Sequence, residues 1–148
     1  MPVLLHDPGM GASIKKRVES LTATMTPNWG KMSVDQMLHH VNLSLAESLG
    51  EYKAERSVRG IPKSWVRWMI LNGPWGKGAP TRKDMYIPLG ERYDFAQEKA
   101  RTISMIDRIL AKPMESEWPE SANFPMTGRH WSQLHYRHVN HHLTQFGV

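Results

Sequence analysis

The stretch of sequence that decides the fold lies near the C-terminus and reads Trp131-Ser132-Gln133-Leu134-His135-Tyr136-Arg137-His138-Val139-Asn140-His141-His142-Leu143-Thr144-Gln145-Phe146. Its apolar residues recur at helical spacing, which predicts a helix over about 129–146 that Gly147 closes. With about 100° of rotation per residue, His138 and His142 fall within about 40° of each other in the middle of the apolar face. The helix is therefore expected to carry two imidazoles into the interior, with His141 at the margin of that face.

Burial of two imidazoles costs free energy unless each ring finds a partner. Residues at i and i+4 lie one helical turn apart, close enough for His138 and His142 to bind one metal ion through ring nitrogens. The alternative is a pair of core histidines that hydrogen-bond to protein groups. A metal would need a further ligand from another helix, and His39 and His40 are the histidines on a rigid helical platform. Helical periodicity does not choose between these two.

The rest of the chain also reads as helices separated by Pro and Gly breaks. They are predicted over about 11–24, 33–49, 62–72 and 92–111. Ser33 and Gln36 form a capping box, Gly50 ends that helix, and no alternating strand pattern occurs. The prediction is a single all-α domain over 1–148, a four-helix bundle whose long crossover carries the short extra helix 62–72. The crossover tryptophans are interpreted as packing over the bundle, or alternatively as a lid or apolar pocket; they are Trp65, Trp68 and Trp75.

The composition excludes several classes of protein. The 148 residues include no cysteine, which rules out a disulfide scaffold, a cysteine-ligated zinc site, an iron–sulfur cluster and a thiol nucleophile. The net charge of +5 is spread along the chain without an arginine-rich arm or a zinc-finger spacing, so nucleic acid is not the expected partner. No apolar run is long enough to span a membrane and no secretory signal is found, so a cytoplasmic protein without membrane association is expected.

Three stretches of the chain resemble the DinB-like superfamily, and within it a bacterial subfamily known only as a domain of unknown function. The stretches are Trp29-Gly30-Lys31-Met32-Ser33-Val34-Asp35-Gln36-Met37-Leu38-His39-His40, Lys77-Gly78-Ala79-Pro80-Thr81 and Tyr136-Arg137-His138-Val139-Asn140-His141-His142-Leu143-Thr144-Gln145-Phe146-Gly147-Val148. The first is similar to the family's Trp-Ser-x-x-Glu/Gln-x-x-x-His segment and places the family histidine on His40, with Gln36 where glutamate is commoner. The third places the family's His-x-x-x-His pair on His138 and His142.

The resemblance implies a bundle of up-down-down-up topology with a divalent metal held by three histidines at one end. It also implies a homodimer. Some relatives are thiol-dependent S-transferases or isomerases that use bacillithiol, mycothiol or glutathione. Many other relatives have no known activity, and the chain carries no known thiol-cofactor signature, so the resemblance implies a metal site more than any one reaction.

Three neutral imidazoles would leave a divalent metal its full charge and an open coordination position, which is typical of catalytic sites. Nitrogen ligands favour zinc or nickel, with copper and iron(II) as alternatives. The leading hypothesis is a metal-dependent enzyme of the S-transferase or hydrolase type, acting on a small-molecule substrate. Any thiolate must come from a cosubstrate because the chain has no cysteine. The competing hypothesis is a non-catalytic metal-containing binding or stress-response module.

Two polar residues are candidates for supporting roles. Glu47 follows His40 by seven residues on the same helix face, on a polar stripe with Gln36 and Ser44. It is the candidate catalytic general base, and its alternative reading is a surface glutamate. Gln145 lies beside the histidine pair and is the candidate to bind the cofactor or to hydrogen-bond a histidine, with helix-end capping as the alternative.

Overall fold

The computed structural model describes residues 1–54, 59–77, 86–121 and 124–148. These residues form five helices and no strand: α1 (Met10–Glu19), α2 (Val34–Ser48), α3 (Lys63–Asn72), α4 (Phe95–Ala111) and α5 (Gly128–Gln145). The all-helical prediction is therefore confirmed for the described part of the chain. Within it, no helix is both long and apolar enough to cross a membrane.

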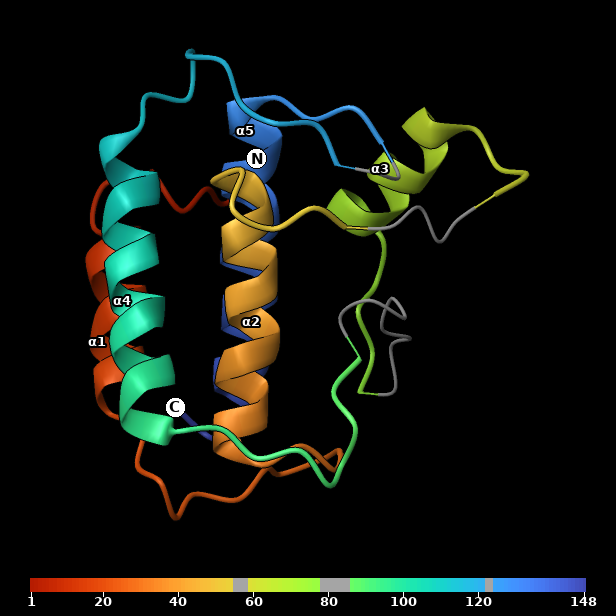
Figure 1. Cartoon of the computed structure of the whole chain (residues 1–148). Coiled ribbons are helices and arrows are strands. Elements are labelled where there is room, and N and C mark those ends of the chain that lie inside the picture. Colours follow the sequence, from red (N-terminus) through yellow and green to blue (C-terminus); the bar gives the residue numbers. More distant parts are fainter. Residues whose placement is uncertain (55–58, 78–85, 122–123) are drawn as a thin grey trace.

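Four of the helices lie side by side, as a four-helix bundle requires (Figure 1). In this view α2 and α4 run upward while α1 and α5 run downward, so the long crossover joins two helices that point the same way. Leucine and isoleucine side chains from α2 and α4 form the centre of the core, where Leu45, Ile106 and Ile109 are fully buried. This arrangement places α5, with its histidines, against α2.

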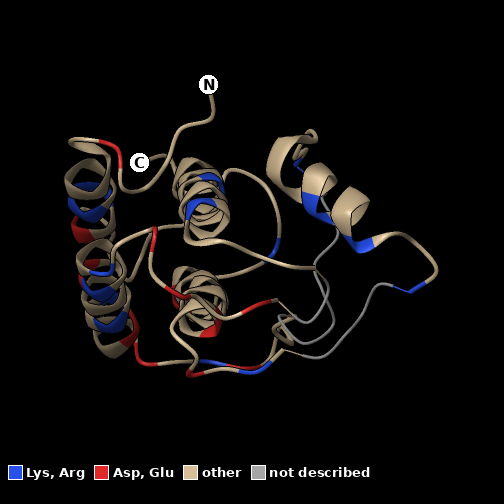
Figure 2. Cartoon of the chain, turned by 90° about the horizontal axis from the view of Figure 1, so that it is seen from above, with Lys and Arg blue, Asp and Glu red and all other residues tan. Residues whose placement is uncertain are grey.

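The crossover helix α3 stands beside the bundle and contacts α5 (Figure 2). This contact accounts for the burial of the polar side chain of Gln133 on α5. The Gln133 side-chain amide donates a hydrogen bond of 2.9 Å to the Leu71 carbonyl at the end of α3. Trp65 and Trp68 remain 52% and 56% exposed, so the prediction that they pack over the bundle is wrong.

The first helix ends at Glu19, five residues before the predicted end near residue 24. The cause is a lysine from the neighbouring helix. Lys99 on α4 donates hydrogen bonds of 2.6 and 3.0 Å to the carbonyls of Glu19 and Leu21. These bonds satisfy carbonyl groups that continued helix would otherwise use, and Leu21 still reaches the core at 2% exposure.

Candidate metal centre

Three histidines from two helices meet inside the bundle. His40 comes from α2, and His138 and His142 come from α5. One ring nitrogen of each lies within 4.8 Å of those of the other two. The ring centroids form a triangle with all three sides 4.9 Å long. The structure thus brings together the three residues that the sequence and the family resemblance proposed as metal ligands.

The choice between the two adjacent histidines of α2 follows from which way each faces. His39 turns toward α4, where its Nδ1 lies 3.1 Å from the Glu98 carboxylate and its ring stacks on Tyr93 at 3.8 Å. His40 turns toward α5, and its Nε2 lies 2.9 Å from the Nε2 of His138. The structure therefore leaves His39 outside the cluster and places His40 in it.

Burial lowers the pKa of two of the three histidines, His138 and His142. It lowers the pKa of His142 to about 3, and the charge of His40 acts in the same direction. The pKa of His138 also lies well below its usual value, chiefly through burial and then through the charges of His40 and His142. Neutral imidazoles are the form that ligates metals. The 2.9 Å approach of two ring nitrogens fits either an N–H donated from one ring to the other or two lone pairs turned toward one cation.

Gln145 fixes the orientation of one histidine. The Nδ1 of His142 donates to the Gln145 Oε1 at 2.8 Å, which leaves the Nε2 lone pair facing the cluster. The amide nitrogen of Gln145 donates in turn to the Trp29 carbonyl at 2.8 Å. Gly30 has a φ of 82°, and a Cβ there would lie 2.6 Å from the Gln145 amide nitrogen. Gln145 therefore bonds a histidine, as one reading of the sequence proposed, rather than capping its helix.

Two substitutions of Gln145 distinguish the effects of its two hydrogen bonds, one to His142 and one to Trp29. Gln145→Leu removes the acceptor for His142, so we expect zinc affinity to fall by about 10- to 100-fold, the range typical of groups that orient metal ligands. Gln145→Glu keeps an acceptor oxygen for His142 and loses only the donor to Trp29, so its affinity should stay closer to that of the unchanged protein. Competition with a chromophoric chelator measures both constants. Equal weakening in the two variants would show that Gln145 acts only through the Trp29 loop.

Glu47 is buried, at 5% exposure, so it is not a surface glutamate. Its carboxylate is not among the atoms gathered within 4.8 Å, which belong to the three histidines alone in the described ranges. Seven residues of α-helix place it about 10 Å along the axis from His40. Its role as a general base stays a prediction.

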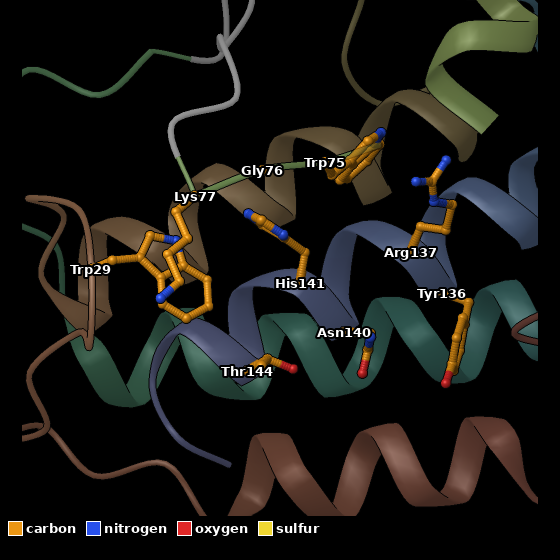
Figure 3. Close-up of a pocket in the computed structure, with 9 residues that line it drawn as sticks. All are labelled: Trp29, Trp75, Gly76, Lys77, Tyr136, Arg137, Asn140, His141 and Thr144. Carbon is orange, nitrogen blue, oxygen red and sulfur yellow. The ribbon is translucent and has the colours of Figure 1, made fainter. Parts of the chain in front are cut away.

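Two tryptophans, Trp29 and Trp75, and a fourth histidine, His141, form an outer layer over the cluster. Of these, Trp29 was not predicted as a site residue. The Trp75 ring lies 6.0 Å from His138 and 5.9 Å from His141. His141 in turn lies 5.2 Å from His142 and 5.9 Å from Trp29. These rings border a pocket of about 430 Å³ on the outer side of α5 (Figure 3). The only sequence signal for Trp29 was its place at the start of the family-like segment.

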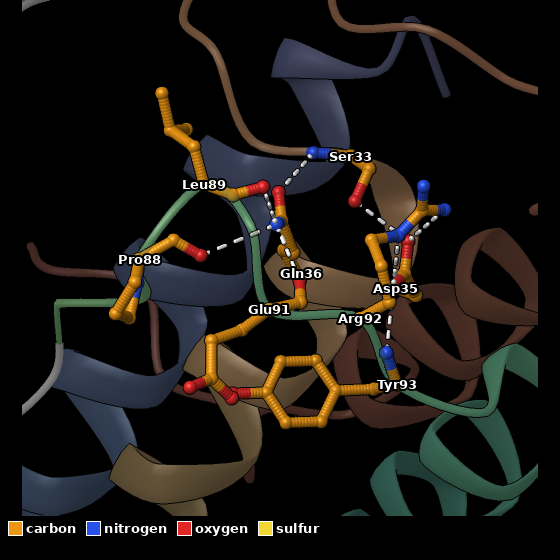
Figure 4. Close-up of polar contacts among 8 residues, drawn as sticks. All are labelled: Ser33, Asp35, Gln36, Pro88, Leu89, Glu91, Arg92 and Tyr93. Carbon is orange, nitrogen blue, oxygen red and sulfur yellow. Dashed lines mark hydrogen bonds and ion pairs between the residues drawn. The ribbon is translucent and has the colours of Figure 1, made fainter.

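The end of α2 that leads to His40 is held by the segment before α4 (Figure 4). The Gln36 Oε1 accepts from the Ser33 backbone N–H at 2.9 Å, completing the predicted capping box. The Gln36 amide nitrogen donates to the carbonyls of Leu89 at 2.9 Å and Glu91 at 2.6 Å. A glutamate would offer no such donor, which explains why glutamine suits this position.

Asp35 ties the same segment down through its carboxylate. It accepts from the Arg92 guanidinium at 3.1 Å through each oxygen and from the Tyr93 backbone N–H at 2.9 Å. Burial by itself raises the pKa of Asp35, but the hydrogen bonds from Arg92, Ser33 and Tyr93 outweigh it and lower the pKa to about 2. Residues 92–93 are thus bound to the start of α2, and α4 begins at Phe95, with the Asp94 side chain as its N-cap accepting from the Gln97 backbone N–H at 2.9 Å.

The fold and the site together define a helical-bundle protein with a buried three-histidine cluster that is positioned to bind a metal ion. No protein-family model, curated protein or solved structure matches the chain. The resemblance to the DinB-like superfamily accordingly stays a prediction.

Proposed function

We propose that the protein is a metal-dependent enzyme of the DinB-like type, in which His40, His138 and His142 hold zinc or nickel. The observation that carries the proposal is the triangle of buried imidazoles with 4.9 Å between ring centroids. With three nitrogen ligands, a divalent metal keeps its charge and an open position, and it lowers the pKa of a bound thiol or water.

The residues of the chain limit which reaction is proposed. Because the sequence has no cysteine, a thiolate must come from a low-molecular-weight cosubstrate. In the transferase form, the cosubstrate sulfur forms a bond to an electrophilic carbon of the small-molecule substrate, and the leaving group departs with its electron pair. In the hydrolase form, the oxygen of water takes the place of the sulfur. The proton released goes to a base, for which Glu47 is the proposed residue.

A non-catalytic metal-containing module, for binding or stress response, is the second candidate. It is favoured by the burial of the histidines, whose exposures are 4% for His40 and 8% for His138 and His142. A closed metal position of this kind is typical of structural sites.

Turnover by untagged protein distinguishes the two candidates. We expect zinc- or nickel-loaded protein to accelerate either the displacement of chloride from 1-chloro-2,4-dinitrobenzene by glutathione or bacillithiol, or the hydrolysis of 4-nitrophenyl acetate. The rate should fall at least about tenfold after removal of the metal with a chelator and return when the metal is restored. A metal-loaded protein with no rate above that of the metal-free protein in either assay would contradict the enzyme and favour the structural module.

A further inference from the structure

The pocket outside α5 carries positive charge without a negative partner in its lining. Among the described residues it is lined by Trp29, Trp75, Gly76, Lys77, Tyr136, Arg137, Asn140, His141 and Thr144. None of these nine is an aspartate or glutamate. Lys77 and Arg137 supply two cations, and a pocket with this charge favours an anionic ligand.

Each cation of the pocket lies over an indole ring. The Lys77 Nζ is 5.2 Å from the centroid of Trp29, and the Arg137 guanidinium carbon is 4.8 Å from the centroid of Trp75. Arg137 is held in place by hydrogen bonds to the carbonyls of Ile70 at 2.8 Å and Gly73 at 2.5 Å. The pocket thus has two flat apolar walls, each with a charged edge (Figure 3).

His141 lies between these two walls. Its ring makes edge contacts with Trp29 and with Trp75, both at 5.9 Å between centroids. Two indoles that flank one imidazole leave space suited to another planar group, because aromatic rings prefer offset or edge-to-face neighbours.

The polar side of the pocket offers a donor whose direction is fixed. The Oδ1 of Asn140 accepts a hydrogen bond of 2.7 Å from Arg17, a residue of α1. The amide nitrogen of Asn140 is therefore the group turned away from Arg17. The Lys77 ammonium is the group that matches the acceptor oxygens of a carboxylate, and the Asn140 amide adds a neutral donor to the lining.

We propose that this pocket binds an aromatic carboxylate, with its ring against Trp29 and Trp75 and its carboxylate on Lys77. The pocket borders the histidine cluster through His141 and Trp75, each of which contacts a histidine of the cluster. The aromatic carboxylate is therefore proposed as the substrate class of the proposed enzyme, and this part of the inference rests on the proposed function. Binding of the carboxylate itself requires no metal.

Binding of two naphthalene probes tests the proposal. We expect 2-naphthoate to bind chelator-treated protein at least about tenfold more tightly than the neutral isostere 2-naphthamide, because a charge-assisted hydrogen bond is worth roughly this much. Lys77→Gln should remove that difference and leave 2-naphthamide binding unchanged. Titration calorimetry gives each constant, and quenching of tryptophan fluorescence gives a second readout.

Lys112→Gln is the matched control, because Lys112 also lies over an indole, that of Trp118 at 4.4 Å, and is not part of the pocket. It should bind both probes as the unchanged protein does. Equal affinity for the two probes, equal loss in the two lysine variants, or 2-naphthoate binding that appears only after metal is added would each overturn the proposal. The probes are tested without metal, so an absence of enzymatic turnover does not contradict carboxylate binding. Likewise, a failure of 2-naphthoate to bind does not contradict the proposed enzyme.

Discussion

The His40→Ala variant is expected to bind zinc at least about a hundredfold more weakly than the unchanged protein, a loss beyond the 10- to 100-fold that groups orienting a ligand usually contribute. The physical reason is the loss of one of the three nitrogens that lie within 4.8 Å of one another. Two imidazoles one turn apart on α5 would remain, and they alone complete no enclosed site. Untagged protein, elemental analysis after dialysis and chelator competition give the stoichiometry and the affinity.

His39→Ala is the matched control, because it removes an imidazole from the adjacent position of the same helix. The His39 ring faces Glu98 and Tyr93 on the other side of α2. Zinc should bind this variant with its affinity changed less than about threefold and its stoichiometry unchanged. Equal zinc affinity in the two alanine variants would sink the assignment of His40 as a ligand, and stoichiometric zinc in His40→Ala would sink the three-histidine centre.

The sequence could predict the helices because each depends on local signals. The capping residues Ser33 and Gln36 lie three positions apart, and the two histidines of α5 lie four positions apart, so both patterns are visible within one or two turns. The structure confirms the helices to within a few residues, apart from the early end of α1. That end depends on Lys99, which is distant in sequence and comes close only through the packing of α4 on α1.

Such local patterns could not predict the third histidine of the cluster or the pocket. Periodicity left His39 and His40 open, and only the resemblance selected His40. Trp29 lies in the loop before α2, and Trp75 follows α3 in the crossover. Each ring lies 5.9 Å from His141 only because both of these segments fold against α5. Contacts between irregular segments carry no period, so a single sequence does not reveal them.

His135 is a further histidine of α5 that is not part of the three-histidine cluster. The side chain is fully buried and stacks on Trp131 with 5.5 Å between centroids. Its Nε2 lies 2.7 Å from the Ser48 hydroxyl. His135 therefore belongs to the α2–α5 interface, and its chemistry is that of a neutral core group with consequences for stability in acid.

Acid is expected to destabilise the protein steeply, with His135 alone contributing up to about 5 kcal/mol between pH 6.5 and pH 3. Burial, with a smaller effect from the charge of His6, lowers the pKa of His135 to about 3 from the value of 6.5 expected in the unfolded chain. Between these values the unfolded state binds the extra proton, so the free energy of unfolding falls as the pH falls. The stabilisation is complete above pH 6.5. A loss of this size is comparable with the whole stability of many domains, about 5–15 kcal/mol.

The double variant His135→Leu/Ser48→Ala isolates this contribution, because it removes both partners of the buried hydrogen bond and nearly conserves volume. At pH 7 its free energy of unfolding should lie within about 1.5 kcal/mol of that of the unchanged protein. Between pH 6 and pH 4 it should lose about 1.4 kcal/mol less per pH unit, the value for one proton. Urea unfolding at several pH values, with a chelator present so that the other histidines titrate equally in both proteins, measures the two slopes. Parallel slopes would mean that His135 does not remain neutral in the folded protein, and a steeper slope in the variant would reverse the sign of the argument.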